Sequence, residues 1–301
     1  MEVDIEMLAA GLGADAIVEW AAPPGPGSAD REIVTCRMPG GGLLRLFCKF
    51  GPLEVHQPPH RFGLAYEAQV YDQLLPAWKD DVPRMHGAFL DDTTQTFGLA
   101  LDYLDGARPL DQVSDAKAGL TAAARWIGRF HRWSETAAVP ALLRRYDTAF
   151  YRTWAQLAEH CTRCLHERFP WLPDLCQRCQ RRLPAILPLA TIIHGEYQAD
   201  NILVYNGRNV TVDWGTAALA AGEIDLASLT WGWGDERAAA CEQQYCLARW
   251  PGGAPEDFAL RLTAARVFLY LRRFASADSE AAPDAVVGEL EQLLPLAERL
   301  E

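Results

Sequence analysis

The 301-residue sequence is poor in lysine: three lysines stand among its 28 basic residues, and the rest are arginine. Acidic residues outnumber basic ones, so the formal net charge is −12. A chain of this sign is not expected to bind nucleic acids or anionic membranes in a general way. A codon bias toward arginine explains the overall scarcity of lysine. A lysine in an unusual place therefore needs its own explanation.

The sequence also lacks any run of about 18 apolar residues, so no membrane span is expected. Near its start it carries Glu2, Asp4 and Glu6, where a secretory signal would carry positive charge. We therefore expect a cytoplasmic protein without a membrane partner. In a reducing compartment the eight cysteines are expected to be thiols or metal ligands rather than disulfides.

Half of the residues are hydrophobic and 23% are charged, which is typical of a globular protein. The first part of the chain predicts a small antiparallel sheet with one helix. The helix is expected over 64–75 and ends near Pro76. The strands are expected at residues 17–20, 33–36, 43–50, 84–90 and 97–104.

After residue 106 the pattern becomes mostly helical, with helices expected at 116–133, 149–167, 175–187, 237–250, 255–275 and 283–301. A strand-rich segment at 191–214 interrupts them, and Asn206-Gly207 within it predicts a tight hairpin. We therefore expect an α+β fold with a β-rich N-terminal domain, 1–105, and a mostly helical C-terminal domain, 106–301. The cleft between two such domains is the default ligand site.

Polar side chains gather on both sides of the predicted hairpin. His194, Glu196 and Asn201 precede it, and Asp213 follows it. Carboxylate and amide oxygens are the hard ligands that suit Mg²⁺, which also binds nucleotide phosphates. A further carboxylate could orient or deprotonate a hydroxyl group. Because phosphoryl transfer depends on positioning and charge neutralisation, this set of residues suits that reaction.

The motif His-Gly-x-x-x-x-x-Asn-Ile-Leu, followed by a hydrophobic-Asp-Trp after the hairpin, resembles the aminoglycoside phosphotransferase and choline kinase group. That group has a protein-kinase-like, two-lobed fold. The resemblance implies a catalytic base at Glu196 and a structural histidine at His194. It implies Mg²⁺ ligands at Asn201 and Asp213, with Asp225 bracing the catalytic loop. It also implies ATP and Mg²⁺ as cofactors and a small-molecule hydroxyl as the phosphate acceptor.

The resemblance extends more weakly into the N-terminal half. Lys49 ends an apolar strand, where the group places the lysine that holds the α- and β-phosphates, and Glu67 falls where its glutamate partner lies. The segment 102–106 resembles the hinge whose backbone binds adenine, so Asp102 and Leu104 are expected to bind nucleotide. Two alternatives stay open: a solubilising Lys49 on an edge strand, and an exposed Glu67 on the helix surface.

Two departures from the group affect the prediction. The base position holds Glu196 instead of aspartate, and the extra methylene moves the carboxylate by about 1.5 Å, a shift that can cost ~10²-fold in rate. A second hypothesis is therefore a nucleotide-binding pseudokinase, an interaction protein that Glu196→Asp would convert to measurable transfer. In addition, residues 23–28 do not form the glycine-rich loop of protein kinases, although backbone amides near 25–29 could still contact phosphates.

Two pairs of cysteines suggest a third hypothesis, a helical binding module stabilised by zinc. The spacing of Cys161 and Cys164, and of Cys176 and Cys179, resembles that of a four-cysteine zinc site. The alternative is that these cysteines act as small apolar residues between two helices.

The helices after Asp225 are expected to form the acceptor pocket, with Asp235 and Glu236 as possible partners for an amine. Trp231 and Trp233 either hold a cationic substrate by cation–π contact or pack into the core. Fold resemblance alone does not select the acceptor. Aminoglycosides, other antibiotics, choline-like amines, sugars and other alcohols all remain candidates.

Overall fold

The computed structural model describes residues 9, 11–21, 30–53, 62–276 and 283–300. The chain divides into two compact units. The first unit comprises 1–113 and 200–216, and the second comprises 114–199 and 217–301. The units thus differ from the contiguous spans 1–105 and 106–301, because the segment 200–216 packs with the first. The assignment of separate functions to those two spans stays a prediction.

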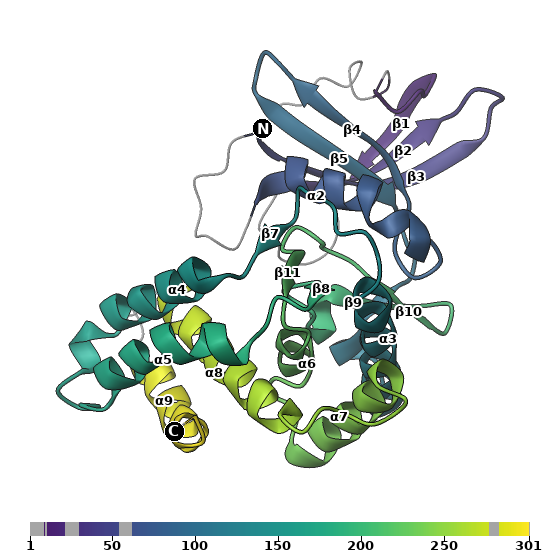
Figure 1. Ribbon diagram of the computed structural model, residues 1–301. Helices are drawn as coiled ribbons and strands as arrows, with labels where there is room; N and C mark the ends of the chain where they lie inside the picture. Colours follow the sequence, from purple (N-terminus) through teal and green to yellow (C-terminus); the bar gives the residue numbers. More distant parts are fainter. Residues whose placement is uncertain (1–8, 10, 22–29, 54–61, 277–282, 301) are drawn as a thin grey trace. The chain divides into compact units, whose positions relative to one another are not determined.

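An antiparallel five-stranded sheet dominates the described part of the first unit, as the sequence predicts (Figure 1). The central position of β3 excludes the interpretation of Lys49 as an edge-strand residue. Strand β5 ends at Asp102, two residues earlier than expected. The sheet order is β1 (Ala16–Ala21), β2 (Asp30–Arg37), β3 (Leu43–Pro52), β5 (Thr96–Asp102) and β4 (Met85–Asp91).

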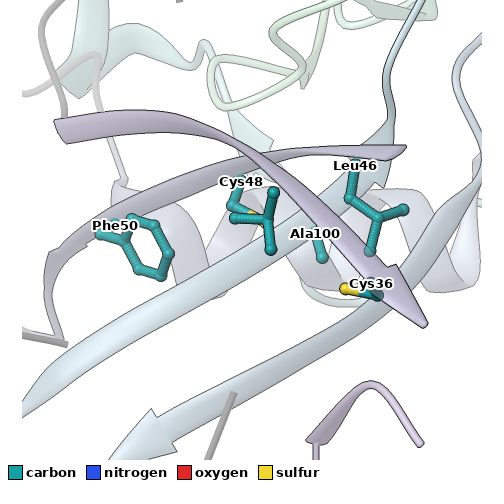
Figure 2. Packing of buried hydrophobic residues seen from close by; sticks show 6 residues of the cluster. Cys36, Leu46, Cys48, Phe50 and Ala100 are labelled. Carbon is teal, nitrogen blue, oxygen red and sulfur yellow. The ribbon is translucent and has the colours of Figure 1, made fainter. Parts of the chain in front are cut away.

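Strand β3 presents different side chains to the two faces of this sheet. Leu46, Cys48 and Phe50 lie on one face in a cluster of buried side chains with Cys36 and Ala100 (Figure 2). Because successive strand residues alternate between faces, Lys49 points to the other face. Helix α2 (Gly63–Gln73) contacts β3, β4 and β5, and it carries the partner of Lys49. A 3₁₀ turn, η1 (Leu75–Trp78), follows this helix.

A second, three-stranded sheet of the first unit consists of β10 (Arg208–Thr211), β9 (Ile202–Tyr205) and β6 (Arg108–Pro109). The predicted hairpin is confirmed: Asn206 and Gly207 take φ of 49° and 72°, the positive values that a type I′ turn requires. The N–H of Thr211 donates to the carbonyl of Asp81 over 2.9 Å. The Arg208 side chain donates to the carbonyl of Asp80. These contacts explain why the hairpin packs with the first unit.

The described part of the second unit is mostly helical, and its helix pairs α3 with α7 and α4 with α5 and α8 are in contact (Figure 1). Its short sheet has the order β7 (Arg144–Arg145), β11 (Ala218–Ala220) and β8 (Thr191–Ile193). The helices are α3 (Ala116–Ser134), α4 (Thr148–Cys161), α5 (Leu172–Ile186), α6 (Glu223–Leu229), α7 (Asp235–Arg249), α8 (Phe258–Ser276) and α9 (Pro283–Glu298).

The expected helix over 149–167 is wrong at its C-terminal end. Helix α4 ends at Cys161, and a 3₁₀ turn, η3 (Arg163–Leu165), follows it. The hydroxyl of Thr162 donates to the carbonyl of Ala158 over 2.7 Å, a local bond that competes with helix continuation. Within the described ranges, no helix is both long enough and apolar enough to cross a bilayer.

Candidate functional site

The first unit contains a buried lysine between two carboxylates. The ammonium group of Lys49 donates to Oε1 and Oε2 of Glu67 over 2.9 and 3.0 Å. It also donates to Oδ1 of Asp213 over 2.7 Å. Lys49 is 9% exposed and Glu67 only 2%, so the interpretation of Glu67 as an exposed helix residue is wrong. Residues from β3, α2 and the segment after β10 thus meet in one cluster.

Electrostatics fix the charge of this lysine. Burial alone would lower the pKa of Lys49, but the two carboxylates raise it well above its ordinary value. Burial raises the pKa of Glu67, against the opposing charge of Lys49 and a hydrogen bond from the backbone of Trp214. Burial, and then the negative charges of Glu67 and Asp213, keep the pKa of Tyr71 far above neutral. Lys49 is therefore a cation at neutral pH, held in one place by three hydrogen bonds.

The hairpin brings the two expected metal ligands to the same end of its strands. Asn201 comes directly before β9, and Val212 donates its N–H to the carbonyl of Asn201 over 3.0 Å. Asp213 is the next residue, and its φ of 65° is unusual for a residue with a side chain. Its side chain is 39% exposed, in contrast to the buried Glu67. One amide and one accessible carboxylate are the oxygen donors that Mg²⁺ binds together with phosphates and water.

The expected hinge offers backbone rather than side-chain groups to a ligand. The carboxylate of Asp102 accepts from the N–H of Arg84 over 3.0 Å and contacts Nε2 of His86 over 2.7 Å. The hydrogen bond with His86 lowers the pKa of Asp102. Leu104 accepts at its carbonyl from Ala107, whereas its N–H has no partner among the described residues. The segment 23–29, considered above as a phosphate loop, lies outside the described residues.

In the second unit, a buried aspartate holds the loop that contains His194. Asp225 accepts from the N–H of His194 over 2.7 Å and from the N–H of Gly195 over 2.9 Å. The φ of Gly195 is 89°, which suits glycine and allows both N–H groups to face the same carboxylate. His194 is fully buried, and its Nδ1 accepts from the N–H of Glu196 over 3.3 Å. The bracing contact expected for Asp225 is therefore present.

A chain of buried hydrogen bonds supports Asp225 in turn. Nε2 of His131 lies 3.1 Å from Oδ2 of Asp225, and Nδ1 lies 2.9 Å from the Tyr245 hydroxyl. Burial lowers the pKa of His131, so the ring is neutral near pH 7. Because a carboxylate only accepts, Nε2 carries the proton, and Nδ1 accepts from Tyr245. Arg249 donates to that same hydroxyl.

Glu196 has a partner that sequence reasoning missed. Arg272, from α8, donates through Nη2 to Oε1 of Glu196 over 3.0 Å. It also donates through Nη1 to the carbonyl of Gly195 over 2.9 Å. The only signal in the sequence is an arginine beside the apolar run of Val267 to Leu271, and no motif links it with Glu196.

Comparison with protein families identifies the family of this chain. Residues 40–258 match the family described as the phosphotransferase enzyme family, APH. The chain belongs to this family. The match covers most of the chain and includes Lys49, Glu67, Glu196 and Asp213. No curated protein matches the chain by sequence.

Solved structures show that this family member has a protein-kinase-like fold. An aminoglycoside-3'-phosphotransferase of type VIII is 21% identical, with a TM-score of 0.56, over 85% of this chain and 93% of that one. Choline kinase LicA from Streptococcus pneumoniae is 11% identical, with a TM-score of 0.63, over 97% and 96%. Spectinomycin phosphotransferase APH(9)-Ia, in complex with ADP and spectinomycin, is 13% identical, with a TM-score of 0.60, over 100% and 98%.

The aromatic residues after α6 are not fully buried in this phosphotransferase family member. Trp231 and Trp233 are partly buried. The ring of Trp231 lies 4.5 Å from that of Tyr270, and the guanidinium of Arg237 lies 5.0 Å from the ring of Trp233. Trp233 thus already contacts a cation of its own chain. Glu236, considered above as an amine partner, is exposed and pairs with Lys117 over 2.6 Å.

The cysteine pairs do not form a zinc site. Cys164 is exposed whereas Cys176 and Cys179 are buried, and burial raises the pKa of the Cys179 thiol to about 12. Zinc binds the thiolate, which such burial disfavours. Across the ranges the structure describes, no three His, Cys, Asp or Glu residues form a group that could hold a metal ion. The buried cysteines therefore act as small apolar residues.

Gly222→Ala is expected to destabilise the protein by about 1–3 kcal/mol, because small-to-large changes in a packed core force neighbours to move. A Cβ at Gly222 would lie 2.5 Å from Nδ1 of His131, 2.6 Å from Nη1 of Arg249 and 2.8 Å from the Tyr245 hydroxyl. Urea unfolding measures the change. Gly252→Ala, where nothing lies within 4 Å, is the control and should stay within about 0.5 kcal/mol. Equal stability of the two variants would contradict the packing argument.

Proposed function

We propose that this protein transfers the γ-phosphoryl group of ATP, with Mg²⁺, to a hydroxyl group of a small molecule. The observation that carries the proposal is the buried ammonium group of Lys49, held within 3.0 Å of both Glu67 and Asp213. Membership of a phosphotransferase family supports it. The complex of spectinomycin phosphotransferase with ADP supports the use of a nucleotide.

The first unit would bind the nucleotide. The Lys49 ammonium would neutralise the α- and β-phosphate oxygens, and Glu67 keeps that ammonium in place. Asn201 and Asp213 would hold Mg²⁺, which supplies charge neutralisation to the transferring phosphoryl group. At the hinge, the N–H of Leu104 would donate to the base, with the backbone of Asp102 beside it. The partnered carboxylate of Asp102 keeps this recognition on the backbone.

The second unit would bind the acceptor. Glu196 would orient the acceptor hydroxyl and take up its proton as the new O–P bond forms. The bond from the γ-phosphorus to its bridging oxygen breaks, and ADP leaves. His194 and Asp225 would act by fixing the backbone of the loop that carries Glu196. A small-molecule acceptor and a cytoplasmic location, with neither nucleic acid nor membrane as partner, complete the proposal.

A second candidate function is that of a nucleotide-binding protein without transfer activity. The observation that favours it is the ion pair of Glu196 with Arg272, which occupies the carboxylate that has to accept a proton. Both candidates bind nucleotide, so binding alone does not separate them.

The test is phosphate transfer from ATP and from GTP, each with Mg²⁺, to a panel of alcohols. The panel contains spectinomycin, one aminoglycoside, choline and ethanolamine, which sample the chemistry of the structural neighbours. Simple sugars extend it to other alcohols. A product heavier by one phosphoryl group, absent when EDTA is added, is the expected result. Nucleotide binding without transfer to any alcohol, and without Mg²⁺-dependent ATP hydrolysis, would favour the second candidate.

A further inference from the structure

The side chain at the proposed base position is fixed by a residue distant in sequence. Arg272 reaches it from near the C-terminal end of α8, 76 positions after Glu196. The same guanidinium group binds the carbonyl of Gly195 and the carboxylate of Glu196, so two of its nitrogens hold the backbone and the side chain of one loop. The Arg272 side chain is 10% exposed and that of Glu196 15%. This geometry is unlike a surface ion pair, in which both side chains move freely.

We propose that Arg272 is a positioning residue that sets the Glu196 carboxylate for phosphoryl transfer. The inference rests on the proposed function and deepens it. It explains how a glutamate could serve at a position where the family has an aspartate. The longer glutamate side chain has one more rotatable bond, and the hydrogen bond from Arg272 restricts its conformation. Positioning errors of about 1 Å cost up to ~10²-fold in rate, so a restrained carboxylate has a large advantage over a mobile one.

The surroundings of Arg272 keep its guanidinium in one orientation. Its central carbon lies 5.9 Å from the ring of Trp154, which is fully buried in α4. Helix α4 also packs against α8. A planar guanidinium offers two donors in fixed directions, whereas a lysine would offer a single compact charge. Arginine is thus suited to hold two oxygens on adjacent residues at once.

The ion pair of Glu196 with Arg272 changes the expected effect of the substitution Glu196→Asp. An aspartate carboxylate would be shorter by one methylene, about 1.5 Å, and would lose its contact with Arg272. Glu196→Asp should therefore lower kcat relative to the wild-type protein instead of raising it. The pseudokinase hypothesis expects the opposite result.

The main experiment measures kcat and KM in Arg272→Ala, with Mg²⁺-dependent ATP hydrolysis as readout if no alcohol of the panel is phosphorylated. We expect kcat to fall by about 10²-fold with KM for ATP within about two-fold, because positioning acts on the reaction step. Guanidinium ion at non-denaturing concentration should restore part of kcat. Arg273→Ala is the matched control: the neighbouring arginine is exposed and pairs with Glu289, and its loss should leave kcat unchanged.

Arg272→Lys and Arg272→Gln keep the test decisive if the alanine variant does not fold. Both variants retain a hydrogen-bond donor but lack the two fixed donors of the planar guanidinium. Both should therefore have a lower kcat while their melting temperatures stay near that of the wild type. In the Glu196→Ala background, Arg272→Gln should cause no further loss. Unchanged kcat in Arg272→Lys and Arg272→Gln, or losses that multiply in the double variant, would overturn the proposal. A wild-type protein that binds nucleotide but neither transfers nor hydrolyses it would instead overturn the proposed function, and with it this role of Arg272.

Discussion

Asp213→Asn is expected to abolish phosphoryl transfer, with kcat reduced by at least about 10³-fold. A bound metal supplies several kcal/mol of charge stabilisation in the transition state, and each 1.36 kcal/mol is tenfold in rate. Asparagine has the size of aspartate but lacks the negative charge that pairs with Lys49 over 2.7 Å and that would bind Mg²⁺. The loss should appear in transfer assays at saturating ATP and Mg²⁺.

Asparagine is a better replacement than alanine here because of the backbone. Asp213 has φ of 65°, a region that asparagine and aspartate tolerate and that costs other residues about 1–2 kcal/mol. In an alanine variant, the effect of losing the carboxylate could not be separated from the effect of backbone strain. Asp72→Asn, an exposed position on α2, is the matched control and should keep full activity. If Asp213→Asn keeps kcat within two-fold and retains its Mg²⁺ dependence, the metal assignment is wrong.

The sequence predicts the local parts of this site well. The distance along the chain between Lys49 and Glu67 suits a strand, a connection and one helical turn, and the two residues do pair. The Asn206-Gly207 signal predicts the hairpin, because type I′ geometry depends on residue types at two adjacent positions. Both inferences rest on short stretches of chain, where residue type and structure are directly linked.

Contacts between distant segments could not be predicted in the same way. In the sequence, Arg272 follows an apolar run within one helix. No residue near it in the sequence indicates that its side chain contacts Glu196. The packing of 200–216 with the first unit depends on contacts such as that of Thr211 with Asp81, which no periodicity reveals. The strands β6 and β7 contain two residues each, too few for any pattern of alternation.

Lys49→Met is expected to destabilise the protein by about 3–5 kcal/mol, in addition to weakening the nucleotide binding proposed for Lys49. Removing one partner of a buried ion pair leaves the other charge uncompensated. Glu67 is the charge left behind, at 2% exposure. Lys79→Met is the control, since Lys79 is exposed, and its effect should stay within about 0.5 kcal/mol. A double variant, Lys49→Met with Glu67→Gln, should recover part of the stability.

The pH dependence of Lys49→Met identifies Glu67 as the source of this loss. Burial already raises the pKa of Glu67, and Lys49 is the main opposing charge, so its removal raises that pKa further. A carboxyl group with a raised folded-state pKa stabilises the fold below its unfolded pKa of about 4.3, and this contribution is lost as the pH rises through the folded value. The difference in free energy of unfolding between variant and wild type should therefore widen as the pH rises above that unfolded-state value. The double variant with Glu67→Gln should show no such widening, because its residue 67 does not titrate. A widening that persists in the double variant would mean that another group takes up the proton.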